Sequence, residues 1–321
     1  MSLINRLLQR MSGQSRHYRA RRRTAYSPFG PQAAQVELLE NRRLLSALTV
    51  TTAADSGAGS LRADIVAAKS GDTINFASSL KGQTITLTSG ELLINKGLTI
   101  QGPGAAQLTI SGGNASRVFD VTSSRPVVLT GLTISNGYNI KAAGGGIYEA
   151  SGSNLTVSAC TISNCRAYPA GGAIYNAGTL TVNGSSLTGD RAGSGGGISN
   201  GGTLTCNGCT LSGDVANFGG GGISNGGTLT ATNCTLSGDV AHGQGNHGGG
   251  GGIYNAGGLL TASGCTLSGD SVSFGAGGGI YQRSGSVRLT NCTIAGNLAN
   301  GATFGMGGGL YLAKVLSKDP S

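Results

Sequence analysis

The chain has 321 residues, of which 60 are Gly and none is Trp, and only 11% are charged, which argues against an ordinary globular enzyme domain. The low Pro count and the lack of a strict three-residue Gly period exclude collagen. The formal charge of +9 is concentrated in residues 1–46, which contain nine Arg and two acidic residues, so the rest of the chain is nearly neutral.

Residues 1–46 are predicted to be a disordered basic leader that targets the chain. No apolar run reaches the roughly 18–20 residues of a membrane-spanning helix, and the N-terminal region lacks the apolar core of a secretory signal. The Arg cluster in residues 16–23 also suits electrostatic binding of nucleic acid or anionic lipid. Because short Arg-rich arms occur in export segments too, we favour targeting over nucleic-acid binding.

Residues 47–71 are predicted to hold a first strand and a short N-terminal capping helix. Ser60 stands at the N-cap position, Leu61 and Ile65 lie one turn apart, and Gly71 follows the last turn. A solenoid must cover the apolar face of its terminal coil, and this helix would cover the first one.

Residues 72–143 are interpreted as irregular first coils, residues 144–311 as regular coils and residues 312–321 as a tail. In the regular part, a Gly-Gly-Gly or Gly-Gly-Ala tripeptide precedes an aliphatic residue in every unit. These aliphatic residues are Ile147, Ile174, Ile198, Ile223, Ile253, Ile280 and Leu310. Two further apolar segments follow in most units, beginning near Leu155 and Ile162 in the first.

Each segment alternates apolar and polar residues over a few positions bounded by Gly or Asn, which is typical of short strands. Units with three such segments and no helical run predict an all-β fold, a right-handed parallel β-helix (solenoid) with about three short strands per coil. The Gly runs would provide turns with positive φ and allow close approach of neighbouring coils. The last coil is expected to be uncapped, which predicts end-to-end association of chains.

Two rows of polar residues are interpreted as structural. Five cysteines share one repeat position, for which we favour a ladder of buried free thiols over disulfides or zinc ligands: Cys160, Cys209, Cys234, Cys265 and Cys292. Four asparagines after the first strand of their units predict an amide ladder at a turn: Asn176, Asn200, Asn225 and Asn255.

A row of aspartates follows Gly in the third-strand turn of successive units: Asp190, Asp214, Asp239 and Asp270. Asp is common in turns, so we favour solvated turn residues. The alternative is a Ca²⁺ site, since carboxylate oxygens are the ligands that calcium prefers. No Asp-rich calcium-loop motif accompanies the row.

A row of tyrosines is predicted on the outward side of the first strand: Tyr148, Tyr175, Tyr254, Tyr281 and Tyr311. Such a row suits recognition of sugars or of a partner protein. Stacked outward aromatics also stabilise one another, which is the favoured interpretation.

The alternative function is that of a carbohydrate-active enzyme, a polysaccharide lyase or hydrolase. Glycoside hydrolysis needs two carboxyl groups in a cleft with separated pKa values, whereas the Asp positions of the repeat have equivalent surroundings. A lyase needs a basic residue beside a metal-held carboxylate. The arginines of the regular coils are spread over several units: Arg166, Arg191, Arg283 and Arg288. No catalytic residue is predicted, and His242 and His247 are assigned to a flexible loop.

Several motifs point to a family: Gly-Ser-Leu-Arg-Ala-Asp-Ile (59–65), Gly-Asp-Thr-Ile-Asn-Phe (71–76), Leu-Thr-Ile-Gln-Gly-Pro-Gly (98–104) and the repeated Gly-Gly-Gly-Ile-Tyr/Ser-Asn. With them, residues 47 to about 311 resemble bacterial right-handed parallel β-helix proteins related to the polymorphic outer membrane protein repeats. The pair Ala63-Asp64 departs from the usual acidic residue followed by Ala. The resemblance implies a surface or secreted protein without an assigned reaction.

Residues 36–47 read Val-Glu-Leu-Leu-Glu-Asn-Arg-Arg-Leu-Leu-Ser-Ala. They are similar to the LEPR-XLL element at the front of large exported bacterial surface proteins, with Asn41 in place of the usual Pro. This resemblance implies export.

The sequence therefore predicts an exported, structural or adhesin-like β-helix module at the cell surface, associated with the outer membrane or extracellular. A surface glycan or another surface protein is the expected partner. No cofactor is predicted apart from the Ca²⁺ alternative at the Asp row.

Overall fold

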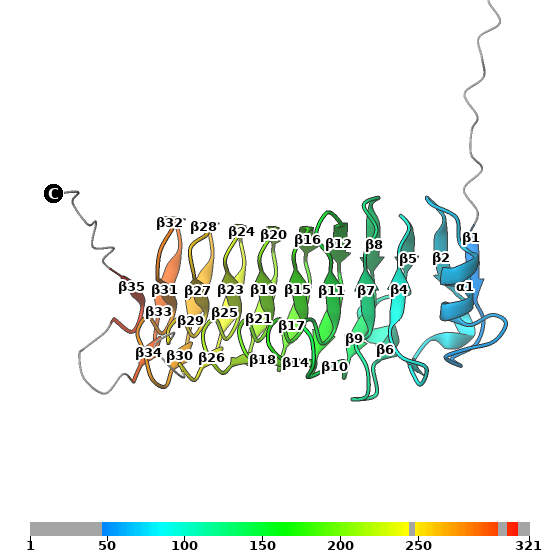
Figure 1. Cartoon of the computed structure of the whole chain (residues 1–321), viewed down its shortest axis with the longest axis horizontal. Coiled ribbons are helices and arrows are strands. Elements are labelled where there is room, and N and C mark those ends of the chain that lie inside the picture. The colour runs from blue at the N-terminus through cyan, green and yellow to red at the C-terminus, as the bar shows by residue number, and fades with distance from the viewer. Residues whose placement is uncertain (1–46, 244–247, 301–306, 314–321) are drawn as a thin grey trace, which may run out of the picture. The chain divides into compact units, whose positions relative to one another are not determined.

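The computed structural model describes residues 47–243, 248–300 and 307–313. The chain divides into two units, Met1–Arg43 and Leu44–Ser321. The first unit and the predicted leader lie outside the described residues. The second unit winds into a parallel β-solenoid whose coils lie side by side (Figure 1), which confirms the predicted all-β parallel solenoid. In the described part of the chain, no helix is long and apolar enough to cross a membrane.

The strands form four sheets, and the strand pairs of sheets A and B are parallel. Sheet A has ten strands: β1 (Ala47–Val50), β2 (Thr73–Phe76), β5 (Thr99–Gln101), β8 (Val127–Thr130), β12 (Asn154–Ser158), β16 (Thr179–Asn183), β20 (Thr203–Asn207), β24 (Thr228–Thr232), β28 (Leu259–Ser263) and β32 (Ser286–Thr290). Sheet B has nine: β3 (Gln83–Thr86), β6 (Leu108–Ser111), β9 (Thr133–Ser135), β13 (Thr161–Ser163), β17 (Ser186–Thr188), β21 (Thr210–Ser212), β25 (Thr235–Ser237), β29 (Thr266–Ser268) and β33 (Thr293–Ala295).

The other two sheets are C and D, of which sheet D has the shortest strands of the four. Sheet C has nine: β4 (Leu92–Ile94), β7 (Phe119–Val121), β11 (Ile147–Glu149), β15 (Ile174–Asn176), β19 (Ile198–Asn200), β23 (Ile223–Asn225), β27 (Ile253–Asn255), β31 (Ile280–Gln282) and β35 (Leu310–Leu312). Sheet D has seven two-residue strands: β10 (Tyr138–Asn139), β14 (Arg166–Ala167), β18 (Arg191–Ala192), β22 (Val215–Ala216), β26 (Val240–Ala241), β30 (Ser271–Val272) and β34 (Leu298–Ala299).

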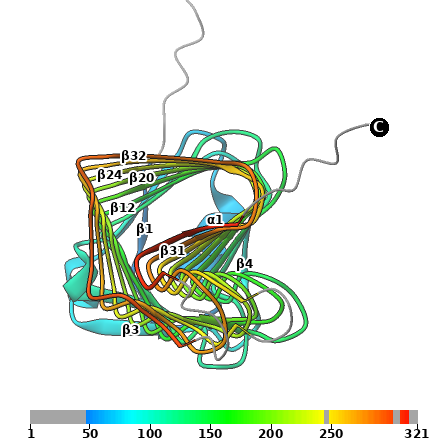
Figure 2. The same ribbon diagram turned by 90° about the vertical axis from the view of Figure 1, so that its left-hand side faces the viewer.

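A regular coil carries four strands, one from each sheet in the order C, A, B, D, as in β15, β16, β17 and β18. The prediction of about three strands per coil was therefore incomplete. A strand of two residues is too short to show the period-two alternation on which the sequence argument relied. Viewed along the stack, the coils superpose closely (Figure 2).

The apolar registers align from coil to coil. Ile174 of β15 pairs with Ile198 of β19, and Leu180 of β16 pairs with Leu204 of β20. All four side chains are fully buried, and each such burial contributes roughly 1.5–3 kcal/mol to the free energy of unfolding. The core is therefore one continuous set of inward ladders.

The Gly-rich turns between sheets D and C have both the positive φ and the close approach of neighbouring coils that the sequence predicts. Gly195 has a φ of 61°, in the region that favours glycine. A β-carbon on the next residue, Gly196, would lie 2.5 Å from the carbonyl oxygen of Gly221 and 2.5 Å from the backbone nitrogen of Val215. The neighbouring backbone therefore leaves no room for a side chain at Gly196.

Helix α1 (Leu61–Ala67) lies at the β1 end of the stack (Figure 1) and packs near β1, β2 and β4. Ser60 is its N-cap, with Oγ accepting a hydrogen bond from the N–H of Ala63 at 3.2 Å. Leu61 and Ile65 are buried in the apolar core. Two 3-10 turns, Ser78–Leu80 and Ala105–Gln107, complete the described helical structure.

Toward the other end of the stack the inward residues are less covered. Val287 and Leu289 of β32 are half-buried, whereas their register partners Leu260 and Ala262 in β28 are buried. The predicted end-to-end association of chains stays a prediction.

Candidate functional site

The four aspartates of the repeat lie inside the solenoid. The side chains of Asp190, Asp214, Asp239 and Asp270 are all 0% exposed. Each Oδ1 accepts a backbone N–H from the preceding coil: Cys165 to Asp190 at 2.7 Å, Asp190 to Asp214 at 2.8 Å, Asp214 to Asp239 at 2.9 Å and Asp239 to Asp270 at 2.9 Å. The interpretation as solvated turn residues was wrong, because their carboxyl groups bridge neighbouring coils instead of facing water.

The second oxygen of each carboxyl group is buried without a hydrogen-bond partner among the described residues. Burial raises the pKa of Asp190, Asp214 and Asp239 well above the usual value, and it raises the pKa of Asp270 to about 7. A buried charge without a partner is costly, so the neutral acid is favoured at Asp190, Asp214 and Asp239, whereas Asp270 titrates near neutral pH.

Asn297 continues the Asp row and shows which hydrogen bonds a neutral side chain makes there. Its Oδ1 accepts the N–H of Asp270 at 2.8 Å, and its Nδ2 donates to the carbonyl of Leu267 at 3.0 Å. A protonated carboxyl group offers the same acceptor and donor pair. The row is therefore built for neutral side chains. No cluster of three or more His, Cys, Asp or Glu in the described ranges is arranged to hold a metal ion, and Ca²⁺ binding stays a prediction.

A second buried row runs along sheet C. The side chains of Asn176, Asn200, Asn225 and Asn255 form the predicted amide ladder, with Nδ2 to Oδ1 distances of 2.7 Å between neighbours. Glu149 occupies this position in β11, paired with Asn176 of β15. Neither of its carboxyl oxygens has a partner with good hydrogen-bond geometry among the described residues. Burial raises its pKa to about 8, although the nearby backbone N–H groups of Leu155 and Thr179 act in the opposite direction. The protonated form of Glu149 is therefore favoured at neutral pH.

The cysteine row is also confirmed as a ladder of free thiols. Cys160, Cys209, Cys234 and Cys265 are buried, and Cys292 in the last coil is half-buried. Backbone N–H groups of Cys209 and Cys234 lie 3.4 Å from the sulfur of the cysteine in the following coil. These thiols serve packing and short polar contacts between coils.

The tyrosine row is stacked, with ring centroids 5.4 Å apart for Tyr148 and Tyr175, 5.6 Å for Tyr254 and Tyr281, and 5.3 Å for Tyr281 and Tyr311. Tyr254 is only 7% exposed, because the backbone at Gly219 covers its ring. Its assignment to a recognition surface is therefore wrong. Mutual stacking accounts for the row, and recognition through Tyr148, Tyr175 and Tyr281 stays a prediction.

The burial of these acids decides the charge of the outer surface. Residues 144–311 contain five acidic residues, and all of them are 0% exposed: Glu149, Asp190, Asp214, Asp239 and Asp270. The same range contains four arginines, all of which are exposed: Arg166, Arg191, Arg283 and Arg288. The outer faces of the regular coils therefore carry positive charge and no carboxylate.

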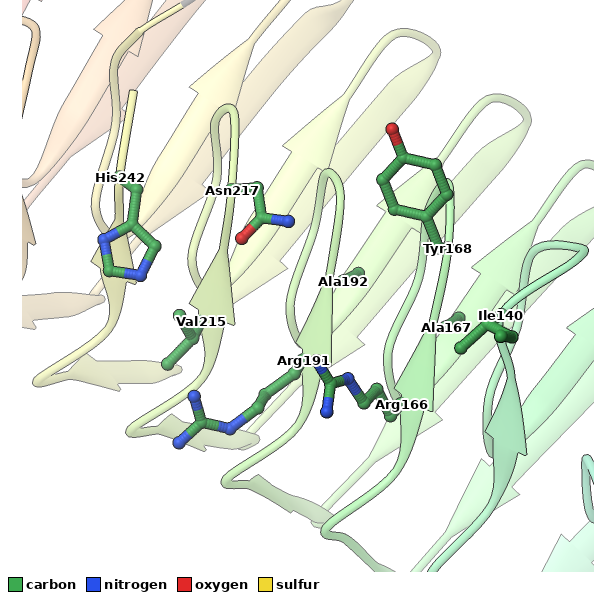
Figure 3. A pocket seen from close by; sticks show the side chains of 9 residues that line it. All are labelled: Ile140, Arg166, Ala167, Tyr168, Arg191, Ala192, Val215, Asn217 and His242. Carbon is green, nitrogen blue, oxygen red and sulfur yellow. The ribbon is translucent and has the colours of Figure 1, made fainter. Parts of the chain in front are cut away.

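Two of these arginines line a hollow of about 390 Å³ over the outer face of sheet D (Figure 3). Arg166 of β14 and Arg191 of β18 are register partners on neighbouring strands. Neither forms an ion pair with any residue that the structure describes. The other lining residues are Ile140, Ala167, Tyr168, Ala192, Val215, Asn217 and His242.

The sequence argument treated Arg166, Arg191 and His242 as unrelated, yet the solenoid brings them to one surface. The available signal was their spacing, since residues about one coil apart in the chain become neighbours in a sheet. Tyr168, Asn217 and His242 each directly follow a two-residue strand of sheet D, so they share one repeat position and the same spacing was available for them.

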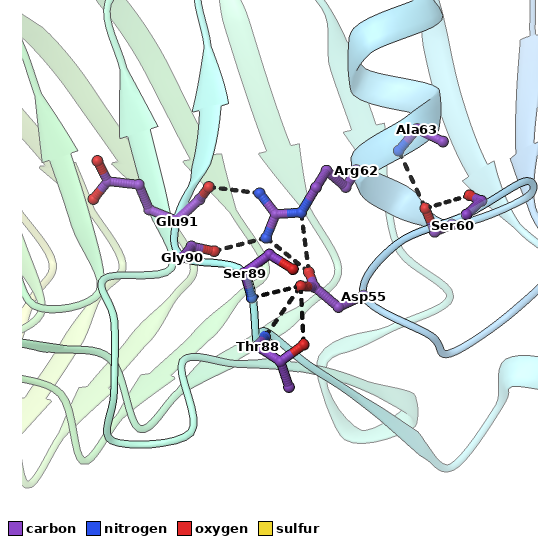
Figure 4. A network of polar contacts seen from close by, with 9 residues as sticks. Asp55, Ser60, Arg62, Ala63, Thr88, Ser89, Gly90 and Glu91 are labelled. Carbon is purple, nitrogen blue, oxygen red and sulfur yellow. Dashed lines mark hydrogen bonds and ion pairs between the residues drawn. The ribbon is translucent and has the colours of Figure 1, made fainter.

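A polar network near α1 has a structural role (Figure 4). Arg62 forms an ion pair with Asp55 at 2.7 Å and donates to the carbonyl of Gly90 at 2.6 Å. The other oxygen of Asp55 accepts the backbone N–H groups of Thr88 and Ser89. Burial alone would raise the pKa of Asp55, but the hydrogen bonds from Ser89, Arg62 and Thr88 outweigh it and lower the pKa to about 2. This network holds α1 against the turn at residues 88–90.

Comparisons with known proteins identify no family for this chain. No family model matches the chain, and no curated protein matches it. Among solved structures, the chain is similar to ORF18 of Geobacillus virus E2, at 15% sequence identity and a TM-score of 0.33. The match covers 80% of this chain and 62% of that protein's length. The resemblance to the polymorphic outer membrane protein repeats therefore stays a prediction. Of the LEPR-XLL-like residues 36–47, only Ala47 lies within the described structure.

Proposed function

We propose that this protein is a non-catalytic interaction module that is exported and binds its partner through the outer faces of the β-solenoid. The separation of charge in residues 144–311 carries the proposal, because every carboxyl group there is buried and every arginine is exposed. Arginines without neighbouring carboxylates favour an acidic partner. The parallel sheets hold such side chains at a fixed spacing along a rigid support.

The alternative, a carbohydrate-active enzyme, has less support. Acid and base catalysis need two groups that reach the substrate and differ in pKa. In the regular coils, the carboxyl groups of Asp190, Asp214 and Asp239 are buried and each accepts a backbone N–H in an equivalent way. Such groups can neither contact a substrate nor divide the two roles between them.

The export part of the proposal rests on the resemblances of residues 36–47 and 59–65 to elements of exported bacterial surface proteins. We further propose that α1 acts as the cap of the first coil. Its buried Leu61 and Ile65 and its Arg62–Asp55 ion pair support that role, since they fasten the helix at the β1 end of the stack.

Fractionation of bacteria that express the full chain tests the proposed location. We expect the protein at the surface or in the medium, accessible to protease in intact cells, with a new N-terminus near Ala47. A variant without residues 1–46 is the control and should stay in the cytoplasm. Recovery of the full chain in the cytoplasm, with its leader intact, would contradict export.

A further inference from the structure

The hollow over sheet D contains two positive charges that nothing in the described structure neutralises. Arg166 and Arg191 lie on adjacent strands, which are about 4.8 Å apart in a parallel sheet. Both side chains are exposed, and Figure 3 shows them extending from neighbouring strands along the same side of the hollow. Like charges on adjacent strands repel each other weakly in water, and an anion that lies against both would remove this repulsion and pair with both.

The hollow is elongated along the stack. Its lining runs from Ile140, which follows β10, to His242, which follows β26. These strands and the three between them form five successive rungs of sheet D, a span of about 19 Å at the usual strand spacing. A hollow of this length suits a chain-like ligand better than a single small ion.

The remaining lining groups suit hydroxyl groups and apolar ring faces. Tyr168 is 48% exposed, and Asn217 and His242 are half-buried. An exposed aromatic ring can stack on the apolar face of a sugar, while amide and imidazole groups hydrogen-bond hydroxyls. Ala167 and Ala192 are small and buried, so they leave the floor of the hollow open to a ligand. Two cations and one aromatic ring are few for nucleic acid, whose binding depends on many phosphate contacts and stacked bases.

We propose that this hollow binds an acidic polysaccharide that runs along the solenoid axis, with carboxylate or sulfate groups held by Arg166 and Arg191 and a sugar ring against Tyr168. This inference rests on the proposed function, because it names the ligand class of the same outer surface. Each guanidinium group would donate charge-assisted hydrogen bonds to an anionic oxygen of the ligand. No covalent step is involved.

Titration calorimetry on the purified full chain tests the inference with a uronic acid tetrasaccharide as probe. We expect saturable binding of the tetrasaccharide and none of the matched tetrasaccharide whose carboxyl groups have been reduced to alcohols. The double variant Arg166→Gln/Arg191→Gln should bind at least about tenfold more weakly, because two charge-assisted hydrogen-bonding groups are lost.

The double variant Arg283→Gln/Arg288→Gln is the control, because it removes the same charge from exposed positions outside the hollow. Its affinity should stay within about twofold of the native protein, since no ligand contact is lost. Equal weakening by both double variants would overturn the inference in favour of net charge alone. Equal binding of the reduced sugar, or tighter binding of a thymidine oligonucleotide, would also overturn it.

The same samples separate this inference from the proposed function. Shortening of a uronic acid polymer, seen as new reducing ends, would contradict a non-catalytic module while leaving the binding site in place. Absence of binding to the charged tetrasaccharide would overturn the ligand class and leave the module without an identified partner.

Discussion

At the scale of single residues, the interior of the regular coils uses carboxylic acids where a neutral amide would also fit. Asp270 and Asn297 occupy neighbouring positions of one row, and both accept a backbone N–H through Oδ1. The raised pKa values of the aspartates agree with a protonated second oxygen that takes the place of the Asn Nδ2 donor. The row therefore depends on hydrogen bonding between coils and not on charge.

Substitutions of Asp239 test whether the row depends on hydrogen bonding and not on charge. Asp239→Asn should leave the thermal midpoint unchanged or higher at neutral pH, because the amide keeps the acceptor for the N–H of Asp214 and supplies a donor. Asp239→Ala should lower the free energy of unfolding by roughly 1–3 kcal/mol, because that buried N–H loses its acceptor. Thermal and denaturant unfolding followed by circular dichroism measure both. Strong destabilisation by the Asn variant would indicate that the native side chain is charged.

At the scale of elements, the Gly-rich turns set how closely the coils approach. Gly196 faces the backbone of the next coil, and its neighbour Gly195 has positive φ. Each turn leads the chain from a two-residue strand of sheet D to the next strand of sheet C. The spacing of the coils therefore depends on glycine as much as on the apolar ladders.

Gly196→Ala should lower the free energy of unfolding by about 2 kcal/mol or more, because its β-carbon would press on the backbone of the next coil. Gly201→Ala is the control, since the nearest atom to its β-carbon would be the carbonyl oxygen of Asn176 at an ordinary 3.6 Å. The control should stay within about 0.5 kcal/mol of the native protein. Similar losses in both variants, measured by denaturant unfolding, would show that close approach of the backbone is not the cause.

At the scale of the whole molecule, Asp55 and the five buried acids of the regular coils have opposite effects on how stability depends on pH. Asp55 has a lowered pKa, so its contribution is present above about pH 4 and is lost as pH falls through about 2. The five buried acids of the regular coils have raised pKa values, so their contribution is complete below about pH 4 and is lost as pH rises. For Asp270 that loss extends through a pKa of about 7, and for Glu149 through about 8.

The thermal midpoint should therefore be highest near about pH 4–5 and fall toward about pH 9, because ionisation of the buried acids opposes folding. Between its unfolded-state and folded-state pKa values, each such group lowers the free energy of unfolding by about 1.4 kcal/mol for each unit of rising pH. Glu149→Gln should make the decline shallower, because the amide cannot ionise, and should equal the native protein at the acidic end. Melting curves at constant ionic strength across this range check both. A midpoint that rises with pH would contradict neutral buried acids.

The fold was accessible from sequence because the repeat gives the same evidence many times. The recurrence of Ile174, Ile198 and Ile223 after Gly-rich tripeptides indicated stacked strands, and the structure pairs these residues in register. The Cys and Asn rows were interpreted correctly for the same reason. The fourth strand of each coil was missed, because two residues cannot display a period.

By itself, the sequence determined which residues share a row, since residues one repeat apart become neighbours in any stacked solenoid. It did not determine which side of the coil a turn residue faces, because a turn has no periodicity to reveal it. Only the tertiary structure placed Asp190 and its counterparts inside and Arg166 and Arg191 outside on a shared hollow. That choice depends on where the closed coil finds hydrogen-bond partners for buried polar groups, and it leaves the outer surface positively charged.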